Sequence, residues 1–148
     1  MLKTQKRVKE MMEALDLPLP NEERPGTEGL NFELLRNLVR EEAEEFDRAM
    51  FILQVLHEYD GPREAENILK YWAEVIDAIC DITFVIHNCS NAMGVDIEPF
   101  FDEVWRANMR KAGGPLSEDG KRLKPPGWKP PPIETMLRNL LATGEAKP

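Results

Sequence analysis

Apolar residues recur at spacings of three and four along most of this 148-residue chain, a pattern that predicts α-helices. The first predicted helix runs from Thr4 to Leu15 and is amphipathic. Prolines at positions 18, 20 and 25 then indicate an extended linker. Two long helices are expected over residues 30–59 and 63–93, separated by Gly61 and Pro62, with Gly94 capping the second.

The rest of the chain predicts one more main helix and a short last one. Asp96 is the expected N-cap of the fourth helix, Pro99 fits its first turn, and the glycines at 113 and 114 are expected to end it. Residues 113–132 form a basic, Pro/Gly-rich and irregular tail, and residues 133–142 a short helix. No strand-like alternation of useful length occurs. The predicted fold is therefore all-α, an antiparallel bundle of about four main helices forming a single domain over residues 1–148, with its core at about 28–112.

Two glutamates interrupt the apolar stripe of the first long helix. Glu42 and Glu45 follow Leu38 and precede Ala49 on the same face, and Glu41 borders it. A carboxylate seldom occupies a core position unless it is paired or binds a metal. Taken alone, such an acidic cluster is usually a solvated helix face.

The second long helix has a matching acidic stripe, which favours a metal site over a solvated face. Glu74, Asp77 and Asp81 lie in line with Phe84 and Asn88 at helical spacing, and we expect these acids to face inward. In an antiparallel pair the two stripes converge, and their charges repel unless divalent cations lie between them. Oxygen-only ligands suit Mg²⁺, with Mn²⁺ possible, and two or more ions are expected.

Charge and hydropathy narrow the expected partners and location. The net charge of −8 opposes binding to nucleic acid or to an anionic membrane. No apolar run approaches the roughly 20 residues of a membrane helix, and the N-terminal segment lacks the apolar region of a signal peptide. We expect a cytoplasmic protein, in the host cytoplasm if it comes from a phage, that binds neither nucleic acid nor membrane.

The tail carries a local excess of basic residues in this acidic chain. Lys121, Arg122, Lys124 and Lys129 suit the outer phosphates of a nucleotide, although a merely solubilising tail explains them equally well. The segment is not a phosphate loop of the Walker type, because Pro115 and Arg122 replace required residues.

Together these motifs resemble the MazG-like all-α nucleoside triphosphate pyrophosphohydrolase superfamily, which includes the dimeric dUTPases and phosphoribosyl-ATP pyrophosphohydrolase. Its Glu-Glu-x-x-Glu motif is matched by residues 41–45, and its Asn-x-x-Lys motif by Asn108 and Lys111. Residues 120–130, GKRLKPPGWKP, resemble the tail of single-domain phage and bacterial members. One departure concerns the Glu-x-x-Asp motif. The register that places the family aspartate at Asp81 puts Ala78 at the glutamate position, and the literal motif, Glu74 to Asp77, lies one turn earlier.

The resemblance implies hydrolysis of a nucleoside triphosphate, preferably a deoxynucleotide, to the monophosphate and pyrophosphate. In that reaction the metal ligands are expected to be Glu42, Glu45, Asp77 and Asp81, with Asp77 replacing the missing glutamate and Glu74 at the fringe. Glu41 or Glu42 would accept the proton of the attacking water. The groups expected to bind phosphate are Asn108, Lys111, Lys121 and Lys124.

The substrate and the assembly state leave alternatives open. Phosphoribosyl-ATP hydrolysis fits the same family chemistry, and a non-enzymatic acidic regulatory or interaction bundle is the rival from another class. The base is not specified by the sequence; the aromatic candidates for stacking on it, each equally explained by core packing, are Phe32, Trp72, Trp105 and Trp128. The second long helix has more apolar surface than a four-helix layer can cover, which predicts a homodimer or tetramer.

Overall fold

The computed structural model describes residues 1–20, 25–59 and 65–148. The described chain contains five α-helices, which confirms the all-α class. In chain order they are α1 (Lys3–Ala14), α2 (Phe32–Glu58), α3 (Ala65–Ala92), α4 (Glu98–Met109) and α5 (Ile133–Thr143). In these described ranges the only β-type pairing is an isolated bridge between Leu116 and Arg122.

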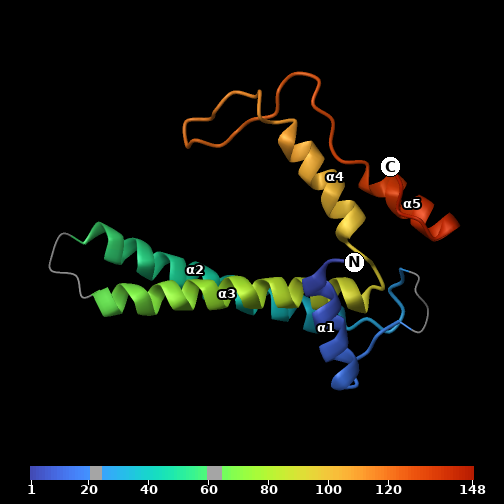
Figure 1. Ribbon diagram of the computed structural model, residues 1–148, viewed down its shortest axis with the longest axis horizontal. Coiled ribbons are helices and arrows are strands. Elements are labelled where there is room, and N and C mark those ends of the chain that lie inside the picture. Colours follow the sequence, from blue (N-terminus) through green and yellow to red (C-terminus); the bar gives the residue numbers. More distant parts are fainter. Residues whose placement is uncertain (21–24, 60–64) are drawn as a thin grey trace.

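The long helices α2 and α3 form an antiparallel pair that is the main body of the molecule (Figure 1). The buried apolar side chains of the pair are small or β-branched, namely Ala49 on α2 and Val75, Ala78 and Val85 on α3. Such side chains let two helix backbones approach closely. The predicted turn at Gly61 and Pro62 lies outside the described residues.

Helix α1 crosses the C-terminal end of α3 and is fastened there by a buried glutamine (Figure 1). The Gln5 amide nitrogen donates to Asn91 Oδ1 at 3.1 Å and to the Val95 carbonyl at 2.6 Å, and its oxygen accepts from the Ile97 amide at 3.3 Å. Val8 and Met12 bury the apolar face of α1 beside it. Because each polar atom of Gln5 is satisfied, its burial fixes where α1, the end of α3 and the start of α4 meet.

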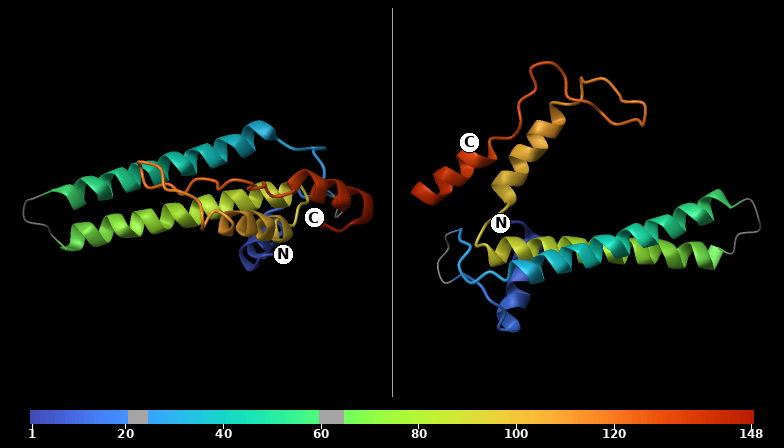
Figure 2. Two further views of the ribbon diagram at one scale, coloured as in Figure 1. Left: turned by 90° about the horizontal axis from the view of Figure 1, so that it is seen from above. Right: turned by 180° about the vertical axis from the view of Figure 1, so that it is seen from behind.

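A glycine turn ends α3 and redirects the chain. Gly94 has φ of 69°, and the amides of Gly94 and Val95 donate to the carbonyls of Asn91 and Ser90, which confirms the predicted cap. After this turn, α4 projects away from the long pair (Figure 2). Among the described helices, α4 contacts only α5.

The ends of α4 differ from the prediction, whereas those of α5 agree with it closely. The N-cap position belongs to Ile97 and not to Asp96, whose Oδ1 accepts a hydrogen bond from the amide of Glu98, two residues further on. The helix ends at Met109 rather than at Gly113, because residues 110–114 fold into successive tight turns closed by backbone hydrogen bonds. Helix α5 ends at Gly144, which has a left-handed conformation.

The chain exposes far more surface than a compact protein of its size. Its accessible surface is 11098 Å², whereas a folded monomer of this mass exposes about 7,700 Å². None of the described helices is both long enough and apolar enough to cross a membrane. A membrane-spanning helix therefore does not explain the excess surface. Part of this surface comes from exposed apolar side chains on α2, α3 and α4.

Candidate functional site

Five carboxylates line one edge of the α2–α3 pair, and we call them the acidic seam: Glu41, Glu42 and Glu45 on α2, and Asp77 and Asp81 on α3. Burial raises the pKa of Glu42 above its ordinary value, and the nearby charge of Asp81 raises it further, followed by the charges of Glu45, Glu41 and Asp77. The two predicted stripes therefore do meet across the pair. Glu42 is the residue whose pKa is raised by carboxylates of both helices.

The acidic seam lies at the edge of the pair and not inside it, which corrects the expectation that the acids of α3 face inward. Asp77 and Asp81 are exposed, and Glu42 is half-buried. The reason is that α3 packs through the neighbouring strip that contains Val75 and Ala78. Within one chain the acids thus remain open to a ligand.

Glu74 stands apart from this group. Its carboxylate lies 3.8 Å from Lys70 Nζ, one turn earlier on the exposed side of α3. Glu74 is not among the charges that raise the pKa of Glu42, whereas Asp77 and Asp81 are. This arrangement supports the register in which Asp77 and Asp81 accompany Glu42, and their role as ligands stays a prediction.

The carboxylate oxygens of the seam are the donor type that a hard divalent cation prefers, but the side chains are not close enough together to coordinate one. In the described parts of the chain, no three His, Cys, Asp or Glu side chains already come together in a way that could hold a metal ion. The donors are all carboxylate oxygens, as Mg²⁺ and Mn²⁺ prefer. Repulsion among these carboxylates contributes to the raised pKa of Glu42, and a bound cation would relieve that repulsion.

A second group of predicted residues comes together at the end of α4, and we call it the basic arm: Asn108, Lys111, Lys124 and Trp128. Trp128 Nε1 donates to the Ala107 carbonyl at 2.8 Å, which anchors the tail on α4. Lys124 Nζ lies 4.5 Å and Lys111 Nζ 5.6 Å from the centroid of the indole ring. Lys111 Nζ also donates to Asn108 Oδ1 at 2.6 Å. Two ammonium groups thus lie beside one ring, and one of them also binds the Asn108 amide.

Lys121 does not join the basic arm. It lies in a small hairpin, where its backbone amide donates to Ser117 Oγ at 3.0 Å and its carbonyl accepts from the Ser117 amide at 2.8 Å. The base of this hairpin is tight, because a Cβ placed on Gly114 would lie 2.0 Å from the Leu123 carbonyl oxygen. The exposed side chain of Lys121 thus extends from a separate part of the tail.

The acidic seam and the basic arm lie on different parts of the molecule. The seam lies on α2 and α3, and α4 makes no helix contact with either of them within the described structure. Figure 2 shows α4 and the tail directed away from the long pair. The phosphate-binding and metal-binding residues that the sequence predicts are therefore not brought together within one chain.

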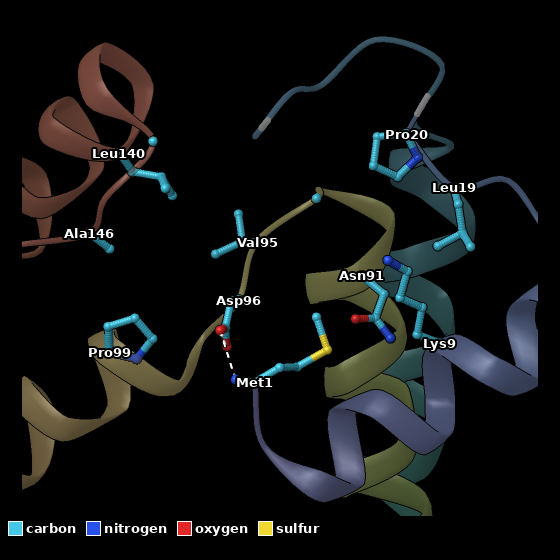
Figure 3. Close-up of a pocket in the computed structure, with 12 residues that line it drawn as sticks. Met1, Lys9, Leu19, Pro20, Asn91, Val95, Asp96, Pro99, Leu140 and Ala146 are labelled. Atoms are coloured by element: carbon cyan, nitrogen blue, oxygen red, sulfur yellow. Dashed lines mark ion pairs between the residues drawn. The ribbon is translucent and has the colours of Figure 1, made fainter. Parts of the chain in front are cut away.

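A cavity of about 340 Å³ between α1, the Gly94 turn and the end of the chain is not where this chemistry lies (Figure 3). Its lining includes Val95, Pro99 and Leu140, together with Asp96, whose carboxylate lies 2.9 Å from the N-terminal amine of Met1. No residue of the acidic seam or the basic arm lines it.

The sequence analysis missed the buried Gln5, which joins α1 to the end of α3. Gln5 occupies a position three residues before Val8 on the apolar face of α1, and that interruption is the same kind of signal that revealed Glu42. His87 is also buried; its Nε2 lies 2.8 Å from Thr4 Oγ1, and its Nδ1 has no partner in the described structure. Only the three-dimensional crossing of α1 over α3 explains why these polar residues are buried.

In a comparison with known protein families, residues 8–108 match the family described as Phosphoribosyl-ATP pyrophosphohydrolase. The matched range covers the acidic seam and ends at Asn108, so it leaves out Lys111, Lys121 and Lys124. No curated protein matches the chain.

Proposed function

Because the chain belongs to the phosphoribosyl-ATP pyrophosphohydrolase family, within the MazG-like superfamily, we propose that it hydrolyses a nucleoside triphosphate between its α and β phosphates. Family membership supports a hydrolase with nucleotide pyrophosphohydrolase activity. The proposal adds a deoxynucleoside triphosphate as substrate, with the monophosphate and pyrophosphate as products. The observation that carries it is the half-buried Glu42 facing Asp81 across the α2–α3 pair.

In this proposal the acidic seam holds Mg²⁺, or Mn²⁺, through Glu42, Glu45, Asp77 and Asp81, with two or more ions. Bound divalent cations supply charge neutralisation for phosphate oxygens and acidify a bound water. Glu41 or Glu42 accepts the proton of the attacking water. This role needs a carboxylate that touches the metal-bound water.

The basic arm supplies the second half of the site. Lys111 and Lys124 hold the outer phosphate oxygens as point charges, and Asn108 contributes a neutral donor. Both lysines lie beside the ring of Trp128. Lys121 extends this group only if the hairpin bends toward it.

A second copy of the chain is the partner that brings the two halves together. Exposed apolar side chains cover the free faces of the long pair and of α4: Phe51, Val55, Leu69, Trp72, Ile76, Ile79, Phe101, Trp105 and Met109. Leu69 is 71% and Phe51 63% exposed, and such large contiguous patches mark interfaces. A homodimer, or a tetramer built from two of them, covers these faces and lets the basic arm of one chain reach the acidic seam of its partner.

Phosphoribosyl-ATP is the second candidate substrate, because the description of the matched family names it. It carries the same triphosphate, so the same residues would act on the same bond. The remaining alternative is a non-enzymatic acidic bundle, in which the seam has no catalytic role.

A product assay separates these three possibilities. The full chain is incubated with each common nucleoside and deoxynucleoside triphosphate and with phosphoribosyl-ATP, in Mg²⁺ or Mn²⁺ and again with a chelator. We expect pyrophosphate and monophosphate in equal amounts with metal, and no turnover after chelation. Release of orthophosphate and a diphosphate, or no turnover on any nucleotide, would contradict the proposal.

A further inference from the structure

A cavity of about 700 Å³ opens at the end of the α2–α3 pair, and we call it the end pocket. It lies where the end of α1, the linker before α2, the start of α2 and the end of α3 come together. Its walls are mainly aliphatic and proline side chains, including Met12, Leu17, Pro25, Leu34 and Leu35. Its volume lies within the range of small-molecule sites in proteins, roughly 300–1,000 Å³.

We infer that the end pocket receives the base of the nucleotide and that the side-chain amide of Asn88 recognises the hydrogen-bonding edge of that base. The inference rests on the proposed function, because it uses the acidic seam as the place where the phosphates bind. It makes Asn88 a specificity-determining residue of the site.

The position of the end pocket relative to the seam fits one nucleotide. Asn88 lies seven residues after Asp81 on α3, and Leu35 lies seven residues before Glu42 on α2. Seven residues correspond to two helical turns, about 10 Å along the axis, in the same direction because the helices are antiparallel. Asn88 also continues the acidic stripe of α3. A nucleotide whose α-phosphate lies at the seam therefore extends its base along the same edge into the end pocket.

The chemistry of the pocket fits a nucleobase, which has apolar faces and a polar edge. The aliphatic walls suit the faces of the ring. Asn88 is half-buried, and its amide makes no hydrogen bond to the described part of the chain, so both a donor and an acceptor remain for a ligand. The other asparagine of the lining, Asn31, already uses its oxygen to accept from the Leu34 amide at 3.0 Å.

In this assignment the base is not recognised by the aromatic residues that the sequence suggested would stack on it. None of the four candidates lines the end pocket, although Phe32 begins the helix beside it. Trp128 belongs to the basic arm, and Trp72 and Trp105 lie 53% and 55% exposed on α3 and α4. Aliphatic contact and one amide, in place of aromatic stacking, then determine which base is accepted.

The test measures both binding and base preference in the full chain. Nucleosides without phosphate (adenosine, guanosine, cytidine, uridine and their deoxy forms) are titrated into protein with methyl-labelled Met and Leu. We expect the methyl resonances of Met12, Leu34 and Leu35 to shift with the preferred nucleoside. Shifts confined to methyl groups elsewhere, or no shift with any nucleoside, would overturn the inference.

Two substitutions test the role of Asn88, with a matched control. Asn88→Ala should raise KM for the best nucleotide by about tenfold and level the preference among bases, while kcat changes little, because one hydrogen bond to the base is lost. Ala92→Leu, one turn further into the pocket, should weaken nucleoside binding by filling the cavity. Asn139→Ala, on α5 and outside the pocket, should change neither. An unchanged base preference in Asn88→Ala would refute the inference.

The result also distinguishes failure of the pocket from failure of the proposed function. If nucleosides shift the pocket methyl groups but no nucleotide is hydrolysed, the base site stands and the hydrolytic function fails. If nucleotides are hydrolysed but Asn88→Ala and Ala92→Leu behave as the parent chain does, the function stands and the base site fails.

Discussion

The acidic seam and the basic arm are built in different ways. The seam comes from one antiparallel pair of helices, and its five carboxylates lie along the same edge because α2 and α3 pack in a fixed register. The basic arm depends on the irregular tail, which folds back onto α4 through the hydrogen bond from Trp128 to Ala107 and the two lysines beside the indole ring. The seam is thus determined by helical periodicity, and the arm by a few specific contacts.

Their separation in space indicates how the protein works. The proposed function needs metal-binding acids and phosphate-binding cations at one place, whereas in the described structure α4 makes no helix contact with α2 or α3. The same chain exposes apolar faces on both parts. The proposed pairing of two chains would account for both observations, because it would cover the apolar faces and join each seam to the arm of the other chain.

The largest effect is expected from neutralising the seam. Asp81→Asn or Glu42→Gln should lower kcat by at least about a hundredfold, because each removes a charge that metal binding and proton transfer require. Helix content should be unchanged, and the fold should be equally or slightly more stable, since a repelling charge is lost. Pyrophosphate release and circular dichroism measure both effects.

Matched controls decide between the two registers. Glu44→Gln removes a carboxylate of the same helix that is exposed and 4.0 Å from Arg40, so activity should remain. Glu74→Gln should likewise retain most activity. If Glu74→Gln is inactive while Asp81→Asn is active, the metal-ligand assignment on α3 is wrong.

A charged residue on the free face of α3 should have the next largest effect. Trp72→Glu places a carboxylate at a position whose side chain is 53% exposed in one chain and would be buried in the proposed dimer. The dimer dissociation constant should rise by at least about tenfold, and activity should fall with it at low protein concentration. Sedimentation velocity measures the association.

The control for association is Leu15→Glu at the end of α1. Leu15 is 61% exposed but lies outside the long pair and α4, so its substitution should not alter association. If the unaltered chain sediments as a folded and active 17.0 kDa species at micromolar concentration, no second copy is needed.

Removing the lysines of the basic arm should have a moderate effect. The double substitution Lys111→Ala, Lys124→Ala should raise KM by about tenfold to a hundredfold, because charged hydrogen bonds to the phosphates are lost. Lys147→Ala, which removes an exposed lysine that pairs with Glu145 near the end of the chain, is the matched control. Equal KM values for both variants would remove the arm from the site.

Much of the fold and about half of the site geometry could be predicted from the sequence. Helical periodicity and the glycine at 94 were sufficient for α2 and α3 and for the meeting of Glu42 with Asp81, because these features are local or depend on one antiparallel register. The outward direction of α4 could not be predicted, because it depends on the backbone conformation of the turn after α3, which a helical pattern does not specify. The end pocket was also missed, since residues from α1, the linker, α2 and α3 form it jointly.

The smallest effect concerns pH and the crossing of α1 over α3. Burial lowers the pKa of His87 below its ordinary value of 6.5. The unfolded chain then binds the proton more readily, so stability is present above about pH 6.5 and is lost as the pH falls through that value. Urea unfolding at pH 7.5 and pH 5.5 should show a greater loss for the parent chain than for His87→Gln. His57→Gln, at an exposed position, should lose as much as the parent chain; equal losses in all three would contradict this role for His87.

The most direct test of the account is complementation between two impaired variants, assayed at a substrate concentration well below the KM of the parent chain. Chains carrying Glu42→Gln lack a working seam, and chains carrying Lys111→Ala and Lys124→Ala lack a working arm. If each site joins the seam of one chain to the arm of another, random pairing of an equal mixture leaves half of the sites intact in half of the dimers. The account then predicts recovery of about one quarter of the parent activity. Activity of the mixture equal to the average of the two separate variants, after subunit exchange has been verified, would contradict it.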